Sequence, residues 1–383
     1  MKIMLTFRLI MLSINTLMAF YFYKRFIPLS LPIFKNKIIL WAYRLLALFL
    51  GASSILYMLL REQTFSRFFI LLFIFSFALL IMLFLSSLLN DLTWLLIYLW
   101  QKIKRETFSS SLKTKISTIL YTFNFLFIAL GFYGGIKTPS IKEVTIPISN
   151  FPFEKFESLK IALISDLHIG DFAQKDFCQS VVEAINGQNP DLVIIAGDLF
   201  DRPPYKIKDY VAPLANLKSR YGSYFVLGNH EYYVGADSVK KLISTLNIKG
   251  LYDETVQIGL PKPLFNLMGV TNSAWQHAGK ISVNFRSANR GRILELPTIM
   301  VSHRPNVAVT EQDRIDLILS GHTHGGQIFP FHFFVARANQ FLAGHYKISS
   351  STQLYLSRGT GLWGPPIRLF APSEITLLTI TAE

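Results

Sequence analysis

Two long runs without any charged side chain set the strongest limit on what this chain can fold into. Residues 68–90 and residues 116–136 contain no Asp, Glu, Lys or Arg. About 20 consecutive apolar residues in a helix are enough to cross the hydrocarbon core of a bilayer. We therefore predict a transmembrane helix over each of these runs.

Two segments nearer the N-terminus fit the same description with one exception each. Residues 38–60 carry only Arg44, and residues 3–23 carry only Arg8. An arginine near the end of a span can extend its side chain to the lipid headgroups. We predict four spans in all, so that residues 1–136 form a transmembrane helical domain.

Two segments within residues 1–136 need a separate interpretation. Residues 91–100 are too short to cross the membrane again, and their Trp and Tyr side chains suit its surface. Residues 1–23 could instead be a signal peptide, since Lys2 precedes an apolar run. The lack of a clear small-residue cleavage site disfavours that alternative.

Basic residues concentrate in this N-terminal part. Residues 1–136 hold 14 Lys or Arg against three acids, whereas the remainder holds 24 against 21. The net charge of +14 therefore does not describe a basic folded domain in the second half. Nucleic-acid binding loses its main support, because it usually requires such a basic face.

The loop charges also predict an orientation. With four spans, the loops after the first and third span carry nine basic residues, and the opposite side carries five. Cytoplasmic loops are enriched in Lys and Arg, so both termini are expected outside the cytoplasm.

Five short polar motifs in the second half each follow an apolar run of strand character. The motifs are Asp166-Leu-His168, Gly197-Asp198-Leu-Phe-Asp201, Gly228-Asn229-His230-Glu231, Ser302-His303 and Gly321-His322-Thr-His324-Gly-Gly326. We predict strands over residues 159–165, 191–196, 223–227, 298–302 and 316–320, with further strands at 353–357 and 374–380. Helices are expected over residues 174–187 and 236–246. The pattern is that of an α/β domain over residues 159–383, preceded by a linker over residues 137–158.

The residue types in these motifs are those of a metal centre. Carboxylate, amide and imidazole groups are donors that Mn, Fe or Zn accepts. Asp166 and His168 stand two residues apart, as do His322 and His324, so each pair projects in one direction from an extended chain. Asp198 is the natural carboxylate to bridge two ions.

In these motifs the chain resembles the calcineurin-like metallophosphoesterase superfamily, over about residues 159–380. The resemblance implies a layered β-sandwich flanked by helices and two divalent metal ions, with Mn expected and Fe or Zn as alternatives. It implies that one ion is held by Asp166, His168, Asp198 and His324, and the other by Asp198, Asn229, His303 and His322. It also implies attack on phosphorus by a hydroxide that bridges the ions. His230 would then protonate or stabilise the leaving oxygen, with Asp201 orienting its ring.

Longer matches resemble a membrane-associated branch related to UDP-2,3-diacylglucosamine pyrophosphohydrolases. They lie at residues 228–233, 320–330 and 358–366. This resemblance implies a multi-pass protein of the bacterial inner membrane acting on a lipid-linked or nucleotide-linked phosphate, with UDP-2,3-diacylglucosamine in lipid A synthesis as the leading substrate. That substrate is made in the cytoplasm, whereas the loop charges place the catalytic domain outside. The alternatives are an outward-facing envelope phosphodiesterase or phosphatase and a non-catalytic metal-binding scaffold.

Several residues near the motifs have two readings. Arg304 stands where the family often has Gln, and an added cation there favours a more anionic substrate. Arg358 and Arg368 could contact phosphate or form surface salt bridges. Glu231 could accept a hydrogen bond from the site or only shape a turn.

The aromatic segment over residues 329–335 could be a buried strand edge or a lip that contacts acyl chains or the membrane. His277, His332 and His345 match no motif and are expected to be ordinary loop histidines. Cys178, the only cysteine, excludes an intrachain disulfide and is expected to be a small core residue.

Overall fold

The computed structural model describes residues 2–25, 36–60, 66–148, 151, 158–259, 261–271, 284–309 and 314–382. The chain divides into two compact units. The helical unit comprises Met1–Tyr133 and Gly364–Ile367, and the α/β unit comprises Gly134–Trp363 and Arg368–Glu383.

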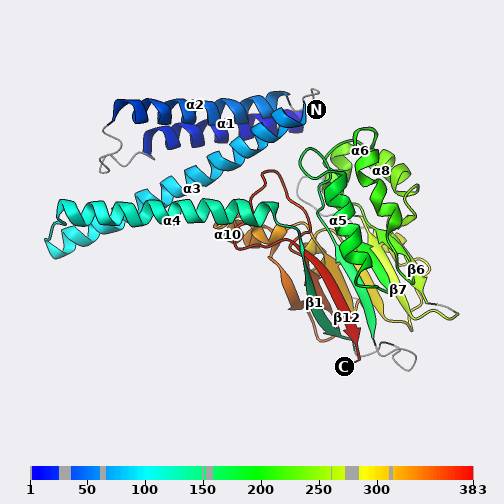
Figure 1. Cartoon of the computed structure of the whole chain (residues 1–383). Helices are drawn as coiled ribbons and strands as arrows, with labels where there is room; N and C mark the ends of the chain where they lie inside the picture. Colours follow the sequence, from blue (N-terminus) through cyan, green and yellow to red (C-terminus); the bar gives the residue numbers. More distant parts are fainter. Residues whose placement is uncertain are drawn as a thin grey trace. The chain divides into compact units, whose positions relative to one another are not determined.

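The helical unit contains four long helices (Figure 1): α1 (Lys2–Arg25), α2 (Lys37–Leu60), α3 (Arg67–Lys104) and α4 (Ser110–Ile136). Of the described residues, those of α3 and α4 form helices long and apolar enough to cross a membrane. Two candidate spans are therefore found where we predicted four. Helices also form at the other two positions, α1 and α2, but spanning by these two stays a prediction.

Helix α3 is longer than the apolar run that predicted it. It continues without a break through residues 91–100, so this segment is the end of α3 rather than a separate element. Its 38 residues reach roughly 57 Å, about twice the thickness of the hydrocarbon core. A buried amide pair joins the two candidate spans, since Asn124 Nδ2 donates to Asn90 Oδ1 at 2.8 Å.

The α/β unit is built on two six-stranded sheets. The first sheet runs in the order β1 (Ser140–Pro147), β12 (Glu374–Thr381), β2 (Leu159–Ile164), β3 (Leu192–Ile195), β4 (Ser223–Phe225) and β5 (Ile248–Gly250). The second runs in the order β10 (Gly344–Lys347), β11 (Gln353–Leu356), β9 (Leu317–Ser320), β8 (Thr298–Ser302), β7 (Phe265–Val270) and β6 (Glu254–Ile258). Strands β2 to β5 are parallel to one another, as are β7, β8, β9 and β11.

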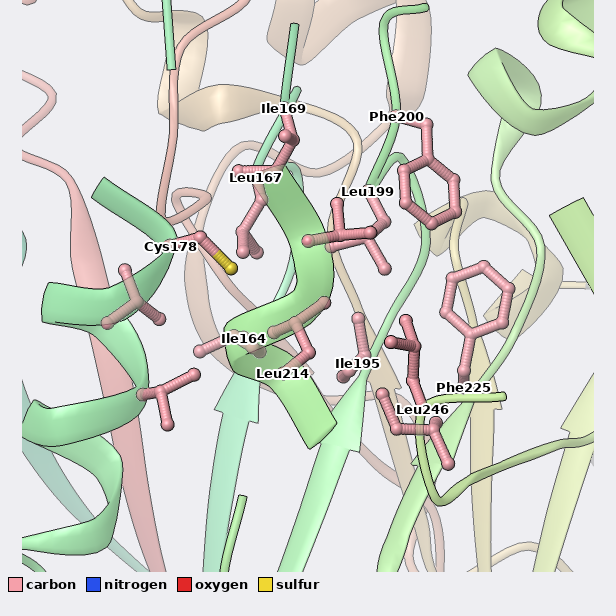
Figure 2. Close-up of a cluster of buried hydrophobic side chains, with 14 of the residues drawn as sticks. Ile164, Leu167, Ile169, Cys178, Ile195, Leu199, Phe200, Leu214, Phe225 and Leu246 are labelled. Carbon is pink, nitrogen blue, oxygen red and sulfur yellow. The ribbon is translucent and has the colours of Figure 1, made fainter. Parts of the chain in front are cut away.

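The sheets pack face to face and are covered by helices. One buried cluster joins side chains of both sheets, including Leu163 and Ile194 from the first and Leu267 and Val301 from the second. A second cluster lies between the first sheet and helices α5 (Lys175–Asn186), α6 (Pro204–Val211) and α8 (Ala236–Ile243). Figure 2 shows part of this second cluster, in which Cys178 points into the apolar interior. Cys178 is thus the small core residue that its sequence context indicates.

The predicted strands that precede the five motifs are all present, as are the predicted helices at α5 and α8. Strand β1 is a correction to the predicted linker over residues 137–158. It pairs in parallel with β12 from Ser140 to Pro147 and so belongs to the first sheet. Its alternation is weak because several of its side chains are half-exposed at the sheet edge, which hides the strand in the sequence.

Candidate metal centre

The five motifs lie at the C-terminal ends of β2, β3, β4, β8 and β9, as the strand assignment predicts. Because these strands run in parallel within each sheet, their ends meet along one edge of the sandwich. Two motif glycines are required by close approach. A Cβ at Gly228 would overlap Asp198 Oδ1, and a Cβ at Gly321 would overlap Asp166 Oδ2.

The backbone of the motifs is held in an uncommon conformation. Five of the seven predicted ligand residues have φ between 49° and 78°, in the left-handed region. They are Asp166, His168, Asp198, His322 and His324. Residues other than glycine rarely adopt this backbone conformation. Such strain concentrates at functional sites, where surrounding contacts enforce it.

One group of potential ligand atoms comes from β2 and β9. His168 Nε2 lies 3.0 Å from His324 Nε2, which in turn lies 3.4 Å from Asp166 Oδ1. Asp166 also accepts hydrogen bonds from the backbone N–H of His322 at 3.0 and 3.1 Å, so its position is fixed. The three side chains are buried and direct donor atoms to one place, which suits a cation.

A second group comes from β3, β8 and β9. His303 Nε2 lies 3.1 Å from Asp198 Oδ2 and 3.2 Å from His322 Nδ1. The other ring nitrogen of His303 contacts the carbonyl oxygen of Ala196 at 2.8 Å, which directs Nε2 toward the site. A further group of His168, Asp198 and His230 overlaps the first two and joins them.

Asn229 completes the predicted ligand set from β4. Its side chain is buried, and Oδ1 has no hydrogen-bond partner among the described residues. A buried amide oxygen without a partner is costly unless something absent from the protein itself satisfies it. The orphaned oxygen therefore fits a divalent cation at this place.

Asp201 links two histidines. Its Oδ1 lies 2.7 Å from His230 Nδ1 and 2.7 Å from His168 Nδ1. The contact with His230 agrees with the pairing implied by the family resemblance, and the contact with His168 is an addition. By accepting from both Nδ1–H groups, the carboxylate directs both Nε2 atoms toward the site.

Electrostatics divide the histidines into two classes. Burial and the neighbouring charge of His303 hold the pKa of His322 well below its usual value. Burial and the neighbouring charge of His168 lower the pKa of His324 in the same way. Burial also opposes protonation of His303 and His230, but carboxylates led by Asp198 raise the pKa of each to about 9. A cation that binds at His303 must displace this proton, so metal binding and proton release are coupled.

Glu231 fixes the loops that follow β3 and β4. Its fully buried carboxylate accepts four backbone hydrogen bonds: Oε2 from Asp198 at 2.9 Å and Gly228 at 2.7 Å, Oε1 from Leu199 at 2.8 Å and Phe200 at 3.2 Å. Of its two readings, the site contact is therefore the one found. Glu231 joins the motif after β3 to the motif after β4.

We expect Glu231→Gln to lower the free energy of unfolding by about 3 kcal/mol, because an amide nitrogen would face two backbone N–H groups and leave them unsatisfied in the interior. Thermal unfolding of the detergent-solubilised chain measures this change. Glu183→Gln is the matched control, since the Glu183 carboxylate accepts from Gln179 on an exposed face of α5. Equal melting temperatures for the two variants would contradict the role of Glu231.

Arg368 fixes the loops around His324 and residues 358–361. The sequence left open whether it contacts phosphate or forms a surface salt bridge. Arg368 is buried and donates to five carbonyl oxygens, those of His324, Arg358, Gly359, Gly361 and Ala371. Burial lowers its pKa to about 10. It therefore makes neither a surface salt bridge nor a free phosphate contact, whereas Arg358 forms an ion pair with Glu374 at 3.2 Å.

His332 and His345 lie outside the cluster. His332 is part of helix α10 (Phe331–Asn339) and His345 is part of β10. The prediction that they are loop histidines is therefore wrong for both. His277 lies outside the described residues. Arg304 follows His303 directly, and its Nε is buried without a hydrogen-bond partner among the described residues.

Residues 159–326 match the family model described as calcineurin-like phosphoesterase. An uncharacterized metallophosphoesterase of Campylobacter jejuni is 32% identical over 383 residues, covering 100% of both chains. One of Helicobacter pylori is 41% identical over 252 residues, covering 65% of this chain and 66% of its own length. A transmembrane protein with metallophosphoesterase domain from Danio rerio is 32% identical over 260 residues, covering 65% of this chain and 59% of its own length.

Proposed function

Because the chain belongs to the calcineurin-like metallophosphoesterases, we propose that it hydrolyses a phosphodiester or phosphoanhydride carried on a lipid, at a centre of two divalent metal ions. The observation that carries the proposal is the convergence of two buried ligand groups beside the Asp201–His230 pair. The test is metal-dependent turnover of bis(p-nitrophenyl) phosphate by the full chain. An active protein would support an enzyme over a non-catalytic scaffold.

The donor atoms fit two cations that share one carboxylate. One ion would be held by Asp166, His168, Asp198 and His324, and the other by Asp198, Asn229, His303 and His322. The neutral imidazoles, the orphaned amide oxygen and the buried carboxylates support this assignment. Donors of this kind accept Mn, Fe or Zn, and Mn is the proposed ion.

Two bound ions supply Lewis-acid stabilisation of phosphoryl oxygens and lower the pKa of water. The protein's own residues then decide where the proton goes. Asp201 accepts the Nδ1–H of His230, so Nε2 is the atom that faces the substrate. In this role His230 gives the Nε2 proton to the departing oxygen, and Asp201 keeps the ring in position.

Arg304 favours a substrate with more than one negative charge. It directly follows His303, its charge helps to lower the pKa of His322, and its Nε is buried without a hydrogen-bond partner among the described residues. Bidentate donors of this kind suit phosphate oxygens. A pyrophosphate or phosphomonoester would use this cation better than a simple phosphodiester.

The lipid-linked substrate is proposed from the apolar helices of the same chain. Helices α3 and α4 would hold the α/β unit at a bacterial inner membrane, and one relative is named a transmembrane protein. UDP-2,3-diacylglucosamine is a candidate whose hydrolysis yields UMP and a diacylglucosamine 1-phosphate. Lipid analysis of a depleted strain would detect its accumulation.

The charges at the ends of α3 and α4 bear on the side of the membrane. Five basic residues lie where the two helices connect: Lys102, Lys104, Arg105, Lys113 and Lys115. If all four helices span, this connection is cytoplasmic and the α/β unit after α4 is outside. If neither α1 nor α2 spans, the basic residues before α3 lie on the side of the α/β unit and the count reverses. The four-span reading favours an outward-facing envelope phosphoesterase over a cytoplasmic lipid A enzyme.

We therefore expect an alkaline phosphatase reporter fused after Glu383 to be active and a fluorescent protein fused there to be dark, since each reports one compartment. The matched control is fusion after Glu106, between α3 and α4, where the two signals should be exchanged. A fluorescent, phosphatase-inactive fusion at Glu383 would contradict the outward reading and restore the cytoplasmic substrate.

A further inference from the structure

Helix α10 and the loops beside it expose an unusual number of large aromatic side chains. No described residue of α10 is buried, and Phe333 and Phe334 are each 69% exposed. Phe370 is 70% exposed and Trp363 54% exposed. We call Phe329, Phe331, Phe333, Phe334, Trp363 and Phe370 the aromatic patch. Of the two readings of residues 329–335, the buried strand edge is therefore wrong.

Five of the six rings lie in two contact groups rather than singly. The ring centroid of Phe329 lies 6.0 Å from that of Phe333 and 5.9 Å from that of Phe370, and Phe331 and Phe334 are 6.4 Å apart. Isolated exposed apolar residues are ordinary, but a contiguous group of this kind marks an interaction surface.

The patch is attached to the metal centre. Gly326, two residues after His324, packs against His332 so closely that a Cβ there would overlap the imidazole. Arg368 holds the carbonyl oxygen of His324 from the segment that bears Phe370. Whatever covers the patch therefore lies beside the catalytic edge of the α/β unit.

The charge around the patch favours an anionic surface. Residues 317–373 contain no Asp or Glu. Of their four basic residues, Arg358 is paired with Glu374 and Arg368 is buried, which leaves Arg337 and Lys347 to attract an anionic partner. Arg337 lies in the last turn of α10 itself. Aromatic rings combined with positive charge are typical of segments that bind the interface of anionic bilayers.

The connection between α4 and β1 is too short to let the α/β unit move far from a membrane that α4 crosses. Helix α4 ends at Ile136 and β1 begins at Ser140, so the connection spans at most roughly 14 Å. If α4 crosses the membrane, the α/β unit cannot leave the bilayer surface by more than this tether allows.

We infer that the aromatic patch inserts into the headgroup region of an anionic bilayer and so presents the metal centre to phosphate groups at that surface. The inference rests on the proposed membrane-anchored function and adds the surface of the α/β unit that faces the lipid. It commits to a lipid surface as the partner.

A fluorophore attached by a cysteine can test this in the full chain. Cys178 is buried, so a maleimide dye would label an introduced Phe333→Cys selectively. In nanodiscs of phosphatidylcholine and phosphatidylglycerol with spin-labelled lipid, we expect emission from position 333 to be quenched at least about twofold, as for an interfacial group. Removing phosphatidylglycerol should weaken the quenching.

Lys218→Cys is the matched control, because Lys218 is exposed and precedes β4, at the sheet edge opposite the motifs. Equal quenching at positions 218 and 333 would overturn the inference. Blue-shifted emission at 333 without lipid quenching would also overturn it, since another protein surface would then cover the patch. The readout needs no turnover, so failure of the proposed hydrolysis would be recognised separately with bis(p-nitrophenyl) phosphate.

Discussion

Asp198→Asn is expected to reduce metal-dependent hydrolysis of bis(p-nitrophenyl) phosphate by about 10³-fold, as for loss of a group that stabilises transition-state charge. Asp198 is the carboxylate that both proposed ions share. Its Oδ2 faces His303 at 3.1 Å, and its Oδ1 accepts the backbone N–H of His230 at 2.8 Å. One substitution therefore disturbs both ions and the loop that carries His230.

The matched control is Asp237→Asn, which removes a carboxylate with a 95% exposed side chain on α8. Activity of this control should equal that of the wild type. The melting temperature of each variant separates loss of the site from loss of the fold. A folded Asp198→Asn protein with full activity would contradict the bridging role.

His230→Asn is expected to lower kcat by about 10²-fold or more for substrates with weakly acidic leaving groups, the usual size of general-acid effects. The loss should shrink as the leaving phenol becomes more acidic, because such an oxygen departs without a proton. The measurement is kcat across a series of aryl phosphodiesters at saturating Mn. The substitution removes none of the proposed ligand atoms of either ion, so the requirement for metal should persist.

His345→Asn is the control, since His345 lies on exposed β10 and contacts Gln353. If the His230→Asn loss were the same for every leaving group, His230 would act by positioning rather than by proton transfer. If metal affinity fell in proportion to kcat, His230 would instead be a ligand.

The placement of the site could be predicted because each motif directly follows a buried strand. Leu192–Ile195 and Leu317–Ser320 are short, wholly buried runs, and the polar residues after them can only lie at the strand ends. The pairing of Asp201 with His230 followed from the family resemblance, and the structure places the atoms 2.7 Å apart.

Other parts depend on contacts that no local pattern contains. Three of the four backbone donors to Glu231 lie 31 to 33 residues away from it, and the His324 carbonyl lies 44 residues from Arg368. Strand β1 is edge-exposed, so its sequence lacks the apolar alternation of an inner strand. Helix α10 is apolar but not buried. The aromatic run in its sequence fits an exposed helix and a buried strand equally well.

Titration of the chelator-stripped full chain with Mn, followed by calorimetry and by hydrolysis of bis(p-nitrophenyl) phosphate, tests the two-metal centre most directly. We predict that the wild type binds two ions per chain, releases protons on binding and gains activity as they bind. Asp198→Asn should lose high-affinity binding of both ions. Hydrolysis by the stripped wild type without metal, or binding of no more than one ion in the active state, would contradict the two-metal account.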